Sequence, residues 1–173
     1  MIVRRAPLDG VCIVEQERLA DERGFFARTY DVDALGPVVQ MSTSFNARAG
    51  TLRGLHFQAA PHEEAKLVRC TRGAMWDVAV DLREDSPTRH RWHGVELTED
   101  NGLALFIPGG FAHGFQTLVD ETEVLYAMST PHVAAAARGL RWDDPAFGID
   151  WPAPPPGGRT MSPRDASYPH VGE

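Results

Sequence analysis

Long apolar runs and cysteines are scarce in this chain of 173 residues. No run of eighteen or more apolar residues occurs, so the sequence predicts no membrane-spanning helix. The first residues, Met1 to Pro7, lack the apolar stretch of a secretory signal, which leads us to expect a cytoplasmic protein. The two cysteines, Cys12 and Cys70, fit neither a disulfide framework nor a zinc-finger spacing, so we expect both to be small buried side chains.

An excess of positive charge is also missing. The formal net charge is -7 at pH 7, which argues against a nucleic-acid or anionic-membrane surface, because such surfaces need cations to displace counterions. A small anionic ligand stays compatible with this charge, since a local cluster can oppose the overall sign. Lysine is nearly absent: sixteen of the seventeen basic residues are Arg, and Lys66 is the exception. Lys66 therefore marks either a place that needs a compact ammonium or a chance survivor on a solvated face.

Length and composition indicate one domain over residues 1–173, with 152–173 as an extended, Pro-rich C-terminal segment. Turn signals such as Asp9-Gly10 and Asn101-Gly102 recur at short intervals, as in an all-β sandwich or barrel. Apolar and polar residues alternate over 76–82, which predicts a half-buried strand. Helix is expected only at a turn opened by Asp31 or Asp33 and in the alanine run 134–137. Further strands are expected at 10–15, 25–30, 67–70, 93–97, 103–107, 115–119 and 123–128.

The segment 102–113 has the pattern strand, tight turn, strand, with His113 in the second strand. It resembles the second motif of the cupin superfamily, a jelly-roll barrel of two packed antiparallel sheets with its active site inside. Cupins usually bind a metal through two histidines one residue apart, a carboxylate and the histidine of this second motif. Here Gln58 stands in place of the second histidine after His56, and Lys66 in place of the carboxylate. Because an ammonium repels a divalent cation, the pattern favours a barrel in which a fixed positive charge replaces the metal.

A histidine and a lysine without a metal suit the abstraction of a proton from carbon next to a carbonyl. The histidine would be the base and the ammonium would stabilise the enolate oxygen. Reprotonation from the opposite face needs a second acid, and Tyr126 lies in phase with Val124 and Met128, which points it inward. On these residues alone, Tyr126 is as well explained as a hydrogen-bonded core tyrosine.

Six segments, in order, resemble the dTDP-4-dehydrorhamnose 3,5-epimerase family over nearly the whole chain. They are DERGFF at 21–26, LRGLHFQ at 52–58, KLVR at 66–69, DVAVDLR at 77–83, IPGGFAHGF at 107–115 and RWDDP at 141–145. The resemblance implies a cofactor-free isomerase that inverts C3, C5 or both in a nucleotide-linked 4-keto-6-deoxy sugar, with dTDP as the expected nucleotide, in deoxysugar or rhamnose-type biosynthesis. It implies that His56 is the base, oriented by Asp165. It further implies that Lys66 stabilises the enolate and that Tyr126 is the acid.

The same resemblance implies a set of substrate-binding positions. The diphosphate side matches Arg23, Arg53 and Arg164, whose guanidinium groups suit bidentate contacts with phosphate. His113 matches a sugar-site histidine. The remaining positions are Phe26, Arg28, Gln40, Ser42, Gln58 and His132.

Departures from the family gather on the nucleotide side. His132 stands where a tyrosine usually stacks on thymine, Arg28 replaces a Glu, and Ala137 replaces another Glu. The family's Gln-Asp-Asn is Gln40-Met41-Ser42 here. An imidazole is a smaller stacking surface than a phenol. The nucleotide, dTDP, CDP or GDP, therefore stays open, whereas the catalytic set is intact.

Three alternatives stay open. One is an epimerase that acts on a single carbon of a different nucleotide sugar, because the outcome depends on how the substrate is posed. Another is a metal-dependent cupin oxygenase or isomerase, if His56, His62, Glu63 or Glu64, and His113 converge. A third is a non-catalytic binder of sugar nucleotides. The resemblance also implies a homodimer, which would cover exposed strand edges, and no nucleic-acid or membrane partner is expected.

Overall fold

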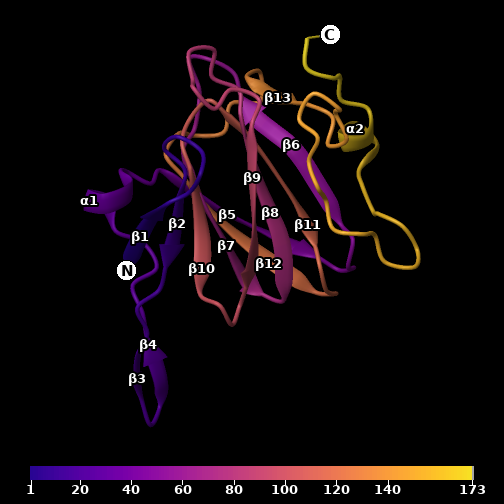
Figure 1. Ribbon diagram of the computed structural model, residues 1–173. Helices are drawn as coiled ribbons and strands as arrows, with labels where there is room; N and C mark the ends of the chain where they lie inside the picture. Colours follow the sequence, from indigo (N-terminus) through magenta and orange to yellow (C-terminus); the bar gives the residue numbers. More distant parts are fainter. Residues whose placement is uncertain (173) are drawn as a thin grey trace.

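Two antiparallel β-sheets pack face to face in the computed structural model, which describes residues 1–172 (Figure 1). One sheet has the order β1 (Ile2–Arg5), β2 (Cys12–Glu15), β10 (Leu103–Ile107), β7 (Lys66–Arg72), β12 (Thr122–Met128) and β5 (Gln40–Asn46). The other has the order β13 (Ala137–Gly139), β6 (Leu52–Gln58), β11 (Phe111–Thr117), β8 (Ala74–Asp81) and β9 (Trp92–Thr98). A hairpin of β3 (Leu19–Asp21) and β4 (Gly24–Phe26) projects away from both sheets. The expected all-β, cupin-like jelly roll is confirmed.

Apolar clusters lie between the two sheets and on part of each outer face. Val68 and Phe115 belong to the central cluster between the sheets. On the outer face of the five-stranded sheet, Val78 packs in a cluster with Phe147 of the C-terminal part of the chain. The outer face of the six-stranded sheet packs against the short helix α1 (Val32–Leu35). The burial of these side chains is the main favourable contribution to folding.

The alternating strand expected at 76–82 is β8, and the half-buried prediction for it is wrong. The face that carries Asp77 and Ala79 points into the barrel, and Asp77 is 0% exposed. The opposite face, with Val78 and Val80, is covered by residues that follow the barrel strands. Alternation finds the two faces of a strand but does not tell which of them a distant segment covers.

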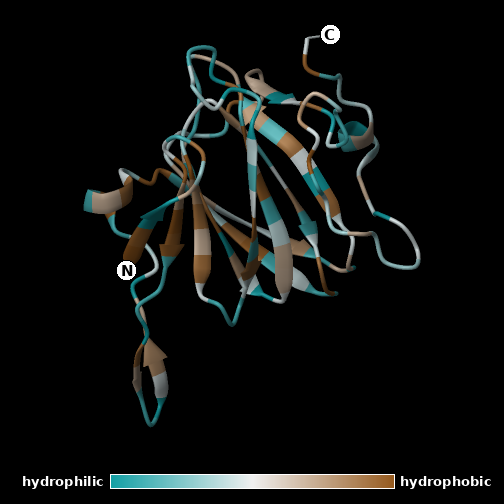
Figure 2. Cartoon of the chain, viewed as in Figure 1, coloured by the Kyte–Doolittle hydropathy of each residue, from teal (hydrophilic) through white to brown (hydrophobic). Residues whose placement is uncertain are grey.

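Most other expected strands are present with shifted ends. The one at 103–107 coincides with β10, whereas the one at 25–30 ends at Phe26. The alanine run 134–137 is a turn that leads into β13 instead of a helix. The sequence pattern missed the short strands β1, β3 and β13. It also missed β5 and β6, which contain many polar residues. Figure 2 shows this contrast: β6 alternates between hydrophilic and hydrophobic residues, whereas β10 is mostly hydrophobic.

The C-terminal segment is only partly extended. Residues 152–158 form no helix or strand, as expected, and Thr160 then makes a bridge to Thr51 beside β6. The short helix α2 (Pro163–Ala166) follows, which the sequence did not predict. Residue 173, the last of the predicted segment, lies outside the described residues. The expected helical turn after Asp31 is confirmed as α1, with Asp31 as its N-cap.

The two cysteines are free thiols with different environments. Cys70 is 2% exposed, as expected, but Cys12 is only partly buried, because it lies on a strand close to the sheet edge. Within residues 1–172, no helix is both long and apolar enough to cross a membrane.

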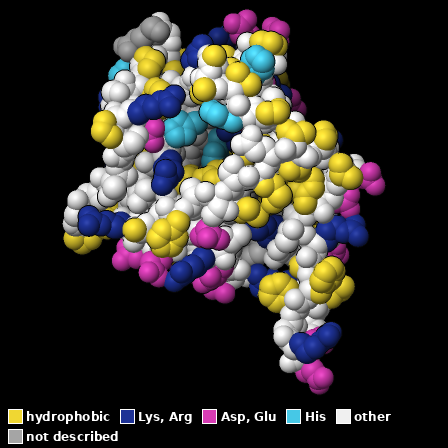
Figure 3. Space-filling model, turned by 180° about the vertical axis from the view of Figure 1, so that it is seen from behind, with side chains coloured by type: hydrophobic (Ala, Val, Ile, Leu, Met, Phe, Trp, Pro, Cys, Tyr) yellow, Lys and Arg dark blue, Asp and Glu magenta, His cyan; other side chains and the backbone are white. Residues whose placement is uncertain are grey.

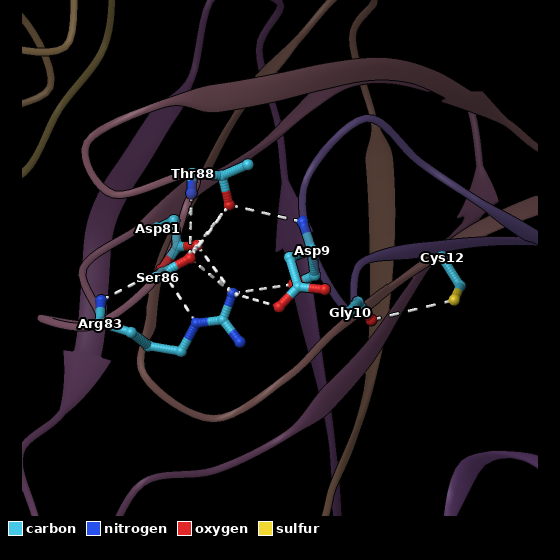
Figure 4. A network of polar contacts seen from close by, with 7 residues as sticks. All are labelled: Asp9, Gly10, Cys12, Asp81, Arg83, Ser86 and Thr88. Atoms are coloured by element: carbon cyan, nitrogen blue, oxygen red, sulfur yellow. Dashed lines mark hydrogen bonds and ion pairs between the residues drawn. The ribbon is translucent and has the colours of Figure 1, made fainter.

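A polar network holds the loop between β8 and β9 (Figure 4). Asp81 accepts hydrogen bonds from the side chains of Arg83, Ser86 and Thr88, and Arg83 also reaches the Asp9 backbone. Burial raises the pKa of Asp81, but these hydrogen bonds outweigh it and hold the pKa at about 2. The network ties the N-terminal loop to the barrel.

Two glycines let β6 and β11 approach closely. A Cβ on Gly54 would lie 2.6 Å from the Gly114 Cα, and Gly54 has a φ of 131°. Side chains at either position would push the strands apart. The pairing sets His56 directly opposite His113 in the register, so the two histidines lie next to each other on neighbouring strands.

Candidate active site

A cavity of about 580 Å³ opens beside β6 and continues into an inner chamber of about 290 Å³. Arg53, His56, Glu64 and His132 line both spaces. The outer cavity is completed by residues 160–168 of the C-terminal segment, and the inner chamber by side chains of β5, β7, β11 and β12. Figure 3 shows this hollow, with histidine side chains inside it and Lys or Arg side chains beside it.

His56 and Asp165 form a pair across the mouth of the chamber. His56 Nε2 lies 2.8 Å from Asp165 Oδ1, and the two side chains are 42% and 8% exposed. The backbone of Asp165 is fixed by helix α2, where its N–H donates to the Ser162 side chain at 3.0 Å. Because an ionised carboxylate only accepts hydrogen bonds, Asp165 holds the ring proton on Nε2 and leaves Nδ1 free to accept another.

Asp165 is held in its ionised form. Burial raises the pKa of this carboxyl, but the hydrogen bond and charge of His56 and the Gly54 N–H together lower it below its usual value. The Gly54 N–H donates to Oδ2 at 3.4 Å. A carboxylate that stays charged can stabilise an imidazolium when His56 takes up a proton.

Lys66 is the first residue of β7 and points into the chamber. Its side chain is 8% exposed, and its Nζ lies 2.9 Å from Glu64 Oε1, which belongs to a side chain that is 10% exposed. The solvated-face interpretation of Lys66 is therefore wrong. An ammonium with little access to water interacts with an oxyanion more strongly than one in bulk solvent.

Tyr126 points into the same chamber from β12, as its phase along the strand predicts. Its hydroxyl lies 3.1 Å from Ser44 Oγ, and its ring meets the His113 ring edge-on at 6.2 Å between centroids. Burial raises the pKa of the phenol far above its ordinary value of 10.0. The phenol is thus protonated at neutral pH and can act as a hydrogen-bond donor or an acid.

His113 and Asp77 form a second His–Asp pair in the barrel. His113 Nε2 lies 2.7 Å from Asp77 Oδ1, and the side chains are 6% and 0% exposed. Asp77 Oδ2 is buried without a hydrogen-bond partner among the described residues. The pair fixes the ring of His113 beside Tyr126 at the base of the chamber.

Several predicted substrate residues lie along the cavity. Arg53 donates to Asn46 Oδ1 at 2.8 Å, and Arg164 lies at the outer cavity with its guanidinium over the Tyr168 ring. Gln40 and Ser42 line the inner chamber, where Gln40 Oε1 accepts the backbone N–H of His132. Basic side chains thus gather at this cavity, although the chain as a whole is acidic.

Gln58 serves mainly to hold the cavity wall. Its side chain is 4% exposed, donates to the His62 and Pro131 carbonyls and accepts the Val133 N–H. These contacts fix the loop that leads to His132.

Three predicted substrate residues lie outside the cavity of the single chain. Arg23 is at the tip of the projecting hairpin, with a side chain 84% exposed and paired with Asp21. Phe26, on the same hairpin, is 73% exposed. The Arg28 side chain is 65% exposed and pairs with Asp31 at the start of α1. Sequence reasoning could not foresee this separation, because it depends on where the hairpin points.

The metal-centre alternative is contradicted. Among residues 1–172, no three His, Cys, Asp or Glu side chains gather in a way that could hold a metal ion. The carboxylate proposed as a ligand, Glu64, faces the Lys66 ammonium instead.

Other residues of the site were not predicted from the sequence. Glu64 and Asp77 were missed as partners of Lys66 and His113, and Ser44 as the partner of Tyr126. Tyr168, whose ring meets His56 edge-on at 5.8 Å, also lines the outer cavity. Asp77 lies on the alternating strand β8, and Ser44 lies on β5 opposite Val124 of β12. The strand pairing, which the sequence does not give, decides what each side chain meets.

Comparison with known proteins agrees with this architecture. The model of the dTDP-4-dehydrorhamnose 3,5-epimerase family matches residues 5–173. A protein of that name from Sinorhizobium fredii is 44% identical over 94% of this chain and 86% of its own length. A dTDP-4-dehydrorhamnose 3-epimerase from Streptomyces niveus is 37% identical over 95% of this chain and 81% of its own length. A Bacillus anthracis dTDP-4-dehydrorhamnose 3,5-epimerase, solved with TDP and PPi bound, is 38% identical and superposes with a TM-score of 0.92 over 98% of this chain and 99% of its own. Sequence and fold agree over nearly the full length, and the chain belongs to the dTDP-4-dehydrorhamnose 3,5-epimerase family.

Proposed function

We propose that this enzyme epimerises a dTDP-linked 4-keto-6-deoxy sugar by moving protons on the carbons next to its C4 carbonyl. The observation that carries the proposal is the chamber itself, in which His56, Lys66 and Tyr126 converge from β6, β7 and β12. An oriented base, a buried cation and a protonated phenol are the groups that enolate chemistry needs.

The proton transfers follow from the contacts. His56 Nδ1 takes the proton from C3 or C5, and the C–H electron pair moves into an enolate whose oxygen at C4 faces the Lys66 ammonium. Asp165 stabilises the imidazolium that results, 2.8 Å away. Tyr126 then donates its phenolic proton to the opposite face of the same carbon. Exchange with solvent returns a proton to Tyr126 and removes one from His56, so the enzyme ends as it began.

Arg53 and Arg164 are proposed to bind the diphosphate, because both line the outer cavity and guanidinium groups bind phosphate bidentately. The nucleoside would then lie in the outer part of the cavity, near His132 and Tyr168. This leaves the smaller inner chamber for the sugar.

The test is incubation with dTDP-, CDP- and GDP-linked 4-keto-6-deoxy sugars in heavy water, followed by proton NMR. We expect deuterium at C3, C5 or both in the dTDP sugar. Exchange at only one carbon would favour the single-carbon alternative, which a relative named as a 3-epimerase also favours. Tight binding without any exchange would refute the enzymatic proposal and favour a non-catalytic binder.

We further propose a homodimer in which the β3–β4 hairpin reaches the partner. Leu19, Phe25 and Phe26 of the hairpin are 69%, 55% and 73% exposed, and Met41 and Phe45 on the edge strand β5 are also exposed. Apolar surface of this kind is typical of an interface. A hairpin that enters the partner's cavity would bring Arg23 and Phe26 to a substrate.

Light scattering tests the dimer. We expect twice the chain mass for the wild type, and dissociation together with a higher KM when Leu19 and Phe26 are both changed to Ser. A wild-type monomer with full activity would refute the proposal.

We also propose that residues 1–173 act as one domain in the cytoplasm. The C-terminal segment supplies Asp165 to the barrel's His56, which supports a single functional unit. The free thiols of Cys12 and Cys70 suit a reducing compartment. Cell fractionation tests the location, and recovery of the chain with membranes or outside the cell would contradict it.

A further inference from the structure

Glu64 is a carboxylate inside the cavity that the proposed reaction does not use. It lines both the outer cavity and the inner chamber, and its side chain is only 10% exposed. Its Oε1 lies 2.9 Å from Lys66 Nζ. The neighbouring Glu63, by contrast, is exposed to solvent. The chain therefore places one of two adjacent carboxylates against its catalytic ammonium.

This contact offsets the charge of the Lys66 ammonium but leaves the group able to interact with a substrate. An ammonium has three N–H donors, and a single carboxylate beside it leaves donors for the substrate. In the proposed reaction the enolate oxygen forms next to the Lys66 ammonium and can accept hydrogen bonds from it. A permanent anion elsewhere on the sugar would lose its hydration on entering the chamber. The Lys66–Glu64 pair has no net charge, so it would not compensate this desolvation cost.

The other charged groups around the chamber do not change this balance. Asp77 is a second buried carboxylate, held by His113. Arg53 lies at the border between the two spaces and, in the proposed complex, faces the diphosphate. Once Arg53 is assigned to the diphosphate and Lys66 is paired with Glu64, the described residues of the inner chamber leave no unpaired Lys or Arg for a second anionic group on the ligand.

We propose that Glu64 is a specificity-determining residue that restricts the chamber to uncharged sugars and excludes nucleotide-linked sugars with a carboxylate at C6. This inference rests on the proposed function. It adds a substrate class that the site rejects and names the side chain that rejects it.

The test compares two ligands that differ only at C6, dTDP-glucose and dTDP-glucuronic acid, by titration calorimetry. We expect the wild type to prefer dTDP-glucose by about tenfold or more. Glu64→Gln keeps the size and an acceptor for Lys66 but removes the charge, so this preference should fall by about tenfold or more. Glu63→Gln makes the same chemical change on the exposed neighbour and should stay within about threefold of the wild type.

A second variant covers the case in which Glu64→Gln does not fold. Lys66→Met leaves Glu64 without its partner, so the preference for dTDP-glucose should stay the same or increase. A wild-type preference below about threefold overturns the inference without any variant. The inference is also overturned if Glu64→Gln keeps the wild-type preference for dTDP-glucose, or if Glu63→Gln changes this preference as much as Glu64→Gln does. If neither ligand binds, the proposed function fails and this inference fails with it; if both bind without the expected shift, the inference alone fails.

Discussion

Replacing Asp165 with Asn tests whether this carboxylate controls where His56 carries its proton. Asp165 Oδ1 lies 2.8 Å from His56 Nε2, so the carboxylate accepts a hydrogen bond from Nε2–H and leaves Nδ1 as the proposed base. An Asn side chain can turn its NH2 group toward Nε2. The ring proton then moves to Nδ1, where it blocks the abstraction of a proton from carbon.

The expected loss has an electrostatic and a tautomeric part. Two unit charges about 4 Å apart attract each other by about 4 kcal/mol at an effective dielectric constant of about 20. The His56 side chain is 42% exposed, so we discount this attraction to about 2 kcal/mol, or roughly 30-fold in rate. The wrong tautomer has cost about 10⁴-fold after the equivalent change in a serine-protease triad. We therefore expect kcat to fall by roughly 10² to 10⁴.

The assay is the rate at which solvent deuterium enters C3 and C5 of the keto sugar, measured by NMR. Asp9→Asn is the matched control, because Asp9 pairs with Arg83 and lines neither the outer cavity nor the inner chamber. The reasoning is wrong if Asp165→Asn keeps more than about a third of the wild-type rate, or if the control loses as much.

The same variant gives a second readout in acid. The pKa of Asp165 in the folded chain lies below its ordinary value, because the contacts with His56, Gly54 and Ser162 outweigh burial. A lowered folded-state pKa contributes stability above the unfolded-state pKa and loses it as the pH falls. The difference in unfolding free energy between wild type and Asp165→Asn should therefore be larger at pH 7 than at pH 3, as urea titrations can show. An equal difference at both pH values would contradict this assignment.

Three further predictions concern the stability of the fold and the role of Tyr126 as the proposed acid. The pKa of Asp81 falls from 3.8 to about 2 on folding, which corresponds to about 2 kcal/mol of stability at neutral pH. Acid unfolding curves should show this stability lost between about pH 4 and pH 2. Asp81→Asn should abolish the pH dependence in this range. Tyr126→Phe should retain deuterium exchange at the carbon that His56 deprotonates but reduce inversion by roughly 10² or more, as NMR of the product stereochemistry can show. Inversion at the wild-type rate would exclude Tyr126 as the acid. Gly54→Ala should destabilise the fold by about 2 kcal/mol or more, because the added Cβ would lie 2.6 Å from the Gly114 Cα; an unchanged melting temperature would contradict this close approach.

The sequence predicted the all-β class from closely spaced turn signals, the jelly roll from the motif at 102–113, and the inward direction of Tyr126 from its phase along the strand. It did not predict β6 as a strand, although this strand carries His56. The polar residues of β6 face the cavity, and a strand that lines a cavity lacks the regular apolar pattern of a core strand. The resemblance to a cupin motif and then to the epimerase family, not periodicity, singled out His56.

Partner side chains were harder to predict than the residues they hold. Glu64 is two residues from Lys66, yet nothing in the sequence tells whether Glu63 or Glu64 turns inward. Asp77 lies in an obvious alternating strand, but its position in the barrel depends on which face the C-terminal segment covers. The position of Arg23 depends on the direction of the hairpin, which no local pattern reports.

His56 and Asp165 are 109 residues apart in the sequence. The residues that build the barrel and the carboxylate that contacts His56 therefore come from different parts of the chain. The buried residues of the central apolar cluster all precede residue 125, whereas Asp165 belongs to the short helix at 163–166. A nascent or clipped molecule that ends near residue 160 could build most of its barrel and still have an imidazole with no fixed tautomer. Under the proposed mechanism, loss of the segment after residue 158 would remove Asp165 and stop proton abstraction while leaving most of the strands in place.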